Sequence, residues 1–187
     1  MTQRPKPSER PSSGRIAPQP AQSDNSDKLM AQIADSFIMS DNWLQYVPLD
    51  PEFVPTELAA ETACTLFSKL VPNADEIGFS FKQDVEFFHP GANWSGVTCP
   101  LCAADIEAWW AARMDEFAAG QLPDLLVETS CCQASVSLND LTYVWPAGFG
   151  RFVLEAMNPN LRCLSGEQES QLEEALNCKL RAIWVHL

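Results

Sequence analysis

Residues 149–186 read FGRFVLEAMNPNLRCLSGEQESQLEEALNCKLRAIWVH and predict a strand at 149–157, a helix at 166–178 and a strand at 180–186. Residues 165–168, Ser-Gly-Glu-Gln, have the spacing of a capping box and therefore open the helix. The last strand is apolar at both alternating sets of positions, which is typical of a strand covered on both faces. The series predicts a βαβ unit with a right-handed crossover and at least one parallel pair of strands.

Upstream, the hydrophobic periodicity predicts further helices and strands. Thr56 is placed to cap a helix that runs to about Leu70, with Leu58, Thr62, Leu66 and Leu70 on one stripe. The other expected elements are strands at 76–82 and 84–89, a helix at 103–119, and strands at 124–129 and 134–138. Together these elements predict an α+β fold, with a mixed sheet, packed helices, the C-terminal βαβ unit and a zinc-ribbon-like insert. No internal repeat is expected.

The composition divides the chain into a tail and one folded domain. Residues 1–28 contain five prolines and almost no large apolar side chains, so burial cannot offset their ordering entropy. We therefore expect a disordered tail at 1–28, a single α+β domain at 29–187, a helix and extended arm at 29–55, and a core at 56–187 with cysteine knuckles at 99–102 and 131–132.

The charge balance excludes some classes of partner. The 187 residues carry a net charge of −13, and residues 29–187 hold 7 basic and 22 acidic side chains. Such a surface repels phosphate backbones and disfavours nucleic-acid binding. No stretch reaches the ~18 apolar residues of a membrane span, so no membrane association is expected. Seven cysteines cannot all pair within one chain, and we expect a reducing, cytoplasmic location.

The cysteines carry the most specific chemical signal. Cys99-Pro100-Leu101-Cys102 is a C-x2-C turn, and Cys131-Cys132 follows 28 residues later. Zinc prefers four such thiolates in a tetrahedron, so we expect Cys99, Cys102, Cys131 and Cys132 to bind one structural zinc ion. Both vicinal cysteines can ligate only if residues 130–133 form a turn, and His89 is the alternative fourth ligand. The competing interpretation is four small buried side chains without metal.

At these residues the sequence resembles a family of uncharacterised bacterial proteins. The shared features are the CPxC and CC motifs followed by Ser137-Leu138-Asn139-Asp140-Leu141, Trp145-Pro146-Ala147-Gly148-Phe149 and Asn158-Pro159. The resemblance runs from about Trp43 to the C-terminus and implies a zinc-ribbon-like insert in an α+β body, without a known activity. Family members often have glycine after each cysteine pair, where this chain has Ala103 and Gln133.

Two functions remain open at this point. The first is a non-enzymatic, zinc-binding bacterial protein that acts through protein contacts, as an accessory or immunity-type protein. The second is a thiol-disulfide oxidoreductase using Cys99 and Cys102, because a CPxC motif directly before a helix is similar to that of glutaredoxins. No other enzyme motif is present, and residues 145–149 are a turn or a partner-binding loop.

Overall fold

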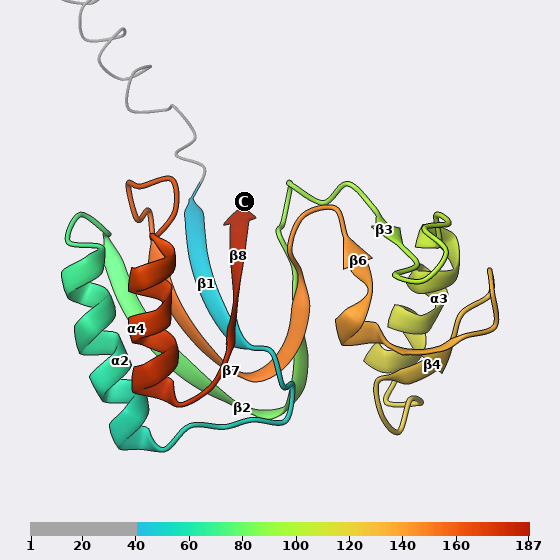
Figure 1. The fold of residues 1–187 in the computed structure, drawn as a ribbon, viewed down its shortest axis with the longest axis horizontal. Helices are drawn as coiled ribbons and strands as arrows, with labels where there is room; N and C mark the ends of the chain where they lie inside the picture. Colours follow the sequence, from blue (N-terminus) through green and yellow to red (C-terminus); the bar gives the residue numbers. More distant parts are fainter. Residues whose placement is uncertain (1–40) are drawn as a thin grey trace, which may run out of the picture. The chain divides into compact units, whose positions relative to one another are not determined.

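The computed structural model describes residues 41–187. The expected tail at 1–28 and the helix expected within 29–40 lie outside this range. No helix in the described range combines the length and apolar character needed to cross a membrane. The described fold is α+β, as expected, with three α-helices and an antiparallel four-stranded sheet (Figure 1).

The four-stranded sheet has the order β2-β7-β1-β8. Its strands are β1 (Asn42–Pro48), β2 (Glu76–Phe88), β7 (Gly148–Met157) and β8 (Leu180–His186). All three neighbouring pairs are antiparallel, so the expectation of a mixed sheet is wrong. Strands β7 and β8 follow one another around a helix and run in the same direction, but β1 lies between them. The expected parallel pair therefore does not form.

Strand β1 is apolar toward both faces of the sheet, with Leu44 and Tyr46 in one core and Val47 in another. Leu44, Tyr46 and Val47 are almost completely buried. Both edges of β1 are paired: Leu44 lies opposite Ala156 on β7 and opposite Trp184 on β8. Residues 42–48 are thus an interior strand of the sheet and not an arm lying against its outside.

Helices α2 (Glu57–Leu70) and α4 (Gly166–Leu176) lie side by side over one face of the sheet (Figure 1). Thr56 caps α2 by accepting a hydrogen bond from the Ala59 amide, as expected. The buried face of α2, however, consists of Ala60, Ala63 and Phe67, and Leu58 at the start of the expected stripe is 73% exposed. Two of the three buried residues are thus small alanines. The spacing of the large apolar residues in the sequence did not indicate that this face of the helix would be buried.

The expected capping box of α4 is confirmed. The Ser165 side chain accepts from the Gln168 amide, and the Gln168 side chain accepts from the Ser165 amide. Leu172 and Leu176 of α4 are buried against the sheet. The helix ends at Asn177, which adopts the left-handed conformation that asparagine tolerates well.

Strand β2 is one long strand where two were expected. Its pairing with β7 shifts between Phe81 and Glu86, because four residues of β2 there face one residue of β7, Arg151. The Arg151 guanidinium donates to the Gln83 carbonyl oxygen in this irregularity, at 2.7 Å. The polar run at 82–84 is therefore a bulge in a continuous strand and not a break between two strands.

The residues between β2 and β7 fold around a second apolar core. They form β3 (Val97–Thr98), α3 (Glu107–Ala118), β4 (Leu126–Glu128), β5 (Ser135–Ser137), η1 (Leu138–Asp140) and β6 (Thr142–Tyr143). The buried members of this core are Val97, Cys99, Ile106, Val136, Leu138, Leu141 and Phe149. Phe149 belongs to β7, so one strand of the sheet supports this core and with it the loops that carry the cysteines.

Helix α3 is fixed to this core by aromatic side chains. Trp110 of the helix stacks on Trp94 with ring centroids 4.4 Å apart, and Phe117 packs edge-on against Phe149 at 5.1 Å. The helix begins at Glu107 and not at 103, because residues 103–106 complete the turn after Cys102. The CPLC motif therefore does not lead directly into a helix.

Candidate metal centre

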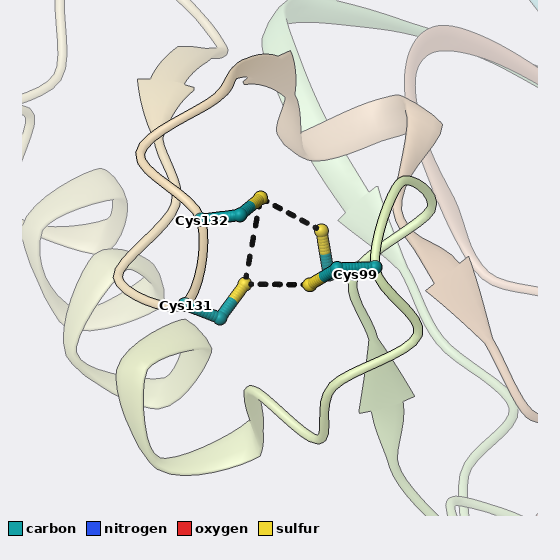
Figure 2. A group of neighbouring side chains, drawn as sticks. Cys99, Cys131 and Cys132 are labelled. Carbon is teal, nitrogen blue, oxygen red and sulfur yellow. Dashed lines mark hydrogen bonds between the residues drawn. The ribbon is translucent and has the colours of Figure 1, made fainter.

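Four cysteine sulfurs from two distant loops meet beside the second core. The Sγ atoms of Cys99, Cys102, Cys131 and Cys132 all lie within 4.8 Å of one another. Figure 2 shows Cys99 on one loop facing Cys131 and Cys132 on the other, with the three side chains converging on a common point. These four residues, which the spacing singled out as ligands, are therefore close enough to hold one metal ion.

The separations between the sulfurs match a tetrahedral thiolate site. Zn–S bonds near 2.3 Å place the corners of a tetrahedron about 3.8 Å apart. The Sγ–Sγ distances are 3.7 Å for Cys99–Cys132, 3.3 Å for Cys102–Cys131 and 3.9 Å for Cys131–Cys132. Cys102, Cys131 and Cys132 are exposed, so the interpretation of four small buried side chains does not hold for these three.

The first pair lies on a tight turn that follows β3. The Cys99 amide donates to the Ala104 carbonyl oxygen at 2.9 Å, and the Ala103 amide donates to the Cys99 carbonyl oxygen at 3.0 Å. Ala103 has a φ of 58°, in the left-handed region that a non-glycine residue enters at a cost of about 1–2 kcal/mol. The turn therefore keeps its geometry although glycine is absent.

The second pair also lies on a turn, as simultaneous ligation by vicinal cysteines requires. The turn connects β4 to β5, with the Thr129 amide donating to the Ala134 carbonyl oxygen and the Gln133 amide donating to the Thr129 carbonyl oxygen, both at 2.9 Å. Gln133 has a φ of 57°. Both sulfurs consequently face the same point, whereas in an extended strand they would face opposite sides.

The two turns are equivalent, residue for residue, at an offset of 30 positions. Residues 97–106 and 127–136 share the same pair of backbone hydrogen bonds and a left-handed residue directly after the last cysteine. Residues 101–106 and 131–136 also have the same order of exposed, half-buried and buried positions. The molecule thus contains a short internal repeat, contrary to expectation. Few identities mark it in the sequence: valine at 97 and 127, cysteine at 102 and 132, alanine at 104 and 134.

Thr129 is the residue of this site that sequence reasoning missed. It occupies the place that Cys99 has in the first turn, and both residues are 1% exposed. The Thr129 hydroxyl lies 3.3 Å from Cys132 Sγ and accepts a hydrogen bond from the Ala134 amide at 3.2 Å. Aligning the chain with itself at an offset of 30 would have revealed it.

The thiols of Cys99 and Cys102 differ in how readily they ionise. Hydrogen bonds from the backbone amides of Cys102 and Leu101 lower the pKa of the Cys99 thiol to about 6. For Cys102 the backbone hydrogen bond from Ala104 lowers the pKa, but the neighbouring sulfurs, led by that of Cys131, and burial together raise it to about 12. The pKa values of Cys99 and Cys102 thus move in opposite directions, and a divalent ion at the common point would favour the thiolate form of both.

The other candidate residues lie outside this cluster. His89, the alternative ligand, accepts a hydrogen bond at Nδ1 from the Gly91 amide and stacks on Phe87. Nδ1 of His186 lies 2.6 Å from Oδ1 of Asn42 and helps hold the edge of the sheet. Within residues 41–187 the only group of three or more metal-ligating side chains is the four-cysteine cluster.

Asn139 connects this region to the sheet, and its role is structural. Its buried amide donates to the Leu49 carbonyl oxygen and accepts from the Phe149 amide. Arg181 of β8 donates to Oδ1 and to the carbonyl oxygen of Asn139, at 2.8 and 2.9 Å, and to the Ala147 carbonyl oxygen at 2.9 Å. These bonds hold residues 138–149 in place, and so Asn139 does more than fix its own turn.

Comparison with known proteins adds no assignment, since no protein-family model, curated protein or solved structure matches this chain.

Proposed function

We propose that this protein binds one zinc ion through Cys99, Cys102, Cys131 and Cys132, and that the ion is structural. The observation that carries the proposal is that four Sγ atoms from two loops lie within 4.8 Å of one another, with three of the six pairs at 3.3 to 3.9 Å, near the ~3.8 Å edge of a zinc tetrathiolate. Four protein ligands fill the coordination shell of zinc and leave no position for water, which is typical of structural and not of catalytic sites.

Metal analysis of the full chain tests this proposal. Protein purified without chelator should contain one zinc per chain, and cobalt substitution should give the visible and charge-transfer bands of a tetrahedral thiolate site. Cys99→Ser should abolish stoichiometric binding, whereas Cys163→Ser, at an exposed cysteine outside the cluster, should not. Substantially less than one metal per chain in never-chelated wild-type protein would refute the zinc site.

The oxidoreductase alternative has one supporting observation, the lowered pKa of Cys99. Two others oppose it. The Cys99 side chain is buried, and α3 begins five positions after Cys102, so the dipole of the helix does not act directly on the motif. The redox alternative also gives Cys131 and Cys132 no role. It predicts disulfide reductase activity that Cys99→Ser abolishes without unfolding the chain; the zinc proposal predicts no such activity in metal-loaded protein.

We further propose that the zinc-bearing region serves protein contacts. Residues 97–147 hold seven acidic side chains and one basic side chain, Arg113. Several large apolar side chains of this region are exposed: Leu101, Leu126, Val144 and Trp145. Acidic surface around exposed apolar side chains suits a basic protein partner, since complementary charge steers the encounter and apolar side chains supply buried area. An accessory or immunity-type role in a bacterial cytoplasm, in keeping with the small size and acidity of the chain, belongs to this proposal.

A binding experiment separates this contact surface from the zinc site. The paired variant Leu101→Ser/Trp145→Ser should weaken capture of a basic partner while retaining one zinc per chain. Leu49→Ser, at an exposed leucine outside residues 97–147, is the matched control. Equal capture by all three proteins would overturn the proposed surface.

A further inference from the structure

The repeated turn assigns unequal places to the four cysteines. In the first turn the ligands occupy positions 99 and 102 of the repeat, and the corresponding positions of the second turn are 129 and 132. Cys132 therefore stands in a regular ligand position. Position 129 holds threonine, and the fourth sulfur comes instead from Cys131, whose counterpart in the first turn is Leu101, 67% exposed and no ligand.

The four sulfurs also differ in how their negative charge is stabilised. Backbone amides donate to Cys99 and Cys102. The Thr129 hydroxyl lies within hydrogen-bonding distance of Cys132 Sγ. Among the described residues, the polar contacts of Cys131 Sγ are only other sulfurs of the cluster, those of Cys99, Cys102 and Cys132. Hydrogen bonds to a thiolate reduce its charge density and its nucleophilicity, so Cys131 is the least protected of the four, and it is exposed.

We propose that Cys131 is the exchangeable ligand of the metal centre: it leaves the ion first and opens a coordination position for an external soft ligand such as a thiolate. Thr129 is the positioning residue for this arrangement. It occupies the position that corresponds to Cys99, so no sulfur can lie there, and its hydroxyl contacts Cys132 Sγ. This inference rests on the proposed zinc site and adds a means of regulating it. Exchange of this one ligand with an external thiolate would loosen the structural ion without displacing the other three ligands.

Alkylation of the zinc-loaded full chain with iodoacetamide tests the order of release. The Cys131 thiolate attacks the methylene carbon, an S–C bond forms, iodide leaves, and the zinc–sulfur bond is lost. Peptide mapping at early times should find modification at Cys131 before Cys99, Cys102 or Cys132, in step with zinc release. Cys163 is exposed outside the cluster, and its modification is scored separately.

A ligand swap provides the matched control. Cys131→Ser should bind cobalt with the spectrum of three sulfurs and with affinity lowered about 10-fold or more, on the scale of altered coordination shells. The double variant Thr129→Cys/Cys131→Ser puts a sulfur in the regular position and should restore the four-sulfur spectrum. Its zinc centre should also react with iodoacetamide about tenfold more slowly than the wild type, because its fourth sulfur is then buried like Cys99.

The results distinguish this inference from the zinc site itself. A wild-type chain without zinc refutes the site and the inference together. One zinc per chain with first alkylation at Cys102 or Cys132, or at all ligands together, overturns only the inference. A folded double variant with the three-sulfur spectrum likewise overturns it, because position 129 would then not be a ligand position. The mapping of the wild type gives its answer even if the double variant does not fold.

Discussion

Glycine at the two left-handed positions should stabilise the protein. Ala103 and Gln133 are exposed residues with φ of 58° and 57°. A non-glycine residue in this conformation destabilises the folded state by about 1–2 kcal/mol. Glycine removes that strain, but it also makes the unfolded chain more flexible, which lowers the free energy of unfolding by about 0.5–1 kcal/mol. Each change should therefore raise the free energy of unfolding by roughly 0.5–1 kcal/mol.

The assay is thermal unfolding followed by circular dichroism, on zinc-loaded and on metal-free protein. The two strained residues lie on different turns with separate backbone hydrogen bonds, so in metal-free protein Ala103→Gly/Gln133→Gly should raise Tm by more than either single change, about 2–8 °C for a domain of this size. Ala104→Gly and Ala134→Gly are the matched controls, one residue further along each turn, where φ is not positive; both should lower Tm. If all four single variants lower Tm alike, the left-handed turns do not carry the assigned strain.

Three further outcomes follow from individual contacts. The hydrogen bond from Lys179 lowers the pKa of Glu173, so Glu173→Gln should reduce the free energy of unfolding near pH 7 by no more than about 1 kcal/mol. The difference in stability between the variant and the wild type should vanish as the pH falls below ~4, where the carboxylate is protonated. Urea titrations at several pH values measure this difference. Asn139→Ala removes the acceptor for Arg181 and Phe149 and should cost about 2–4 kcal/mol in the same titration, whereas Asp140→Ala, at its exposed neighbour, should cost little. Gly148→Ala would place a Cβ 2.0 Å from the Arg181 guanidinium, so it should destabilise the fold, while Gly78→Ala, with open space around its Cα, should not; an unchanged Tm for Gly148→Ala would contradict that packing.

The local elements of the fold were predictable, because their signals lie within a few residues. Thr56 and the Ser165–Gln168 box indicated the starts of α2 and α4, and a continuous run of apolar residues located β8. The strand order was not predictable in the same way. The connection from β7 through α4 to β8 allows β7 and β8 to pair directly, and it equally allows a third strand to lie between them. The structure has the second arrangement, with β1 between them and its Leu44 and Tyr46 buried.

The sequence predicted the four cysteines of the candidate site, but it did not reveal that the two turns that carry them repeat one another. C-x2-C spacing and a vicinal pair identify four thiols, and the turn around 131–132 was required by the geometry of ligation. Thr129 has no metal-ligand chemistry, so nothing in a search for cysteine and histidine could single it out. Ala103 and Gln133 hid the turns further, since glycine is the usual sign of a left-handed residue.

The position of β1 has a consequence for the order in which the chain assembles as it is synthesised. Gln45 of β1 bonds to Glu155, 110 positions later, and β1 reaches its second neighbour only when β8 has been made. The two cysteine turns, by contrast, close over a few residues and lie 30 positions apart, so they are complete before β7 exists. Local contacts form early and distant ones late. The two cysteine turns can therefore form while β1 is still without partners, and β8, the last seven-residue strand, then completes the sheet beside β1.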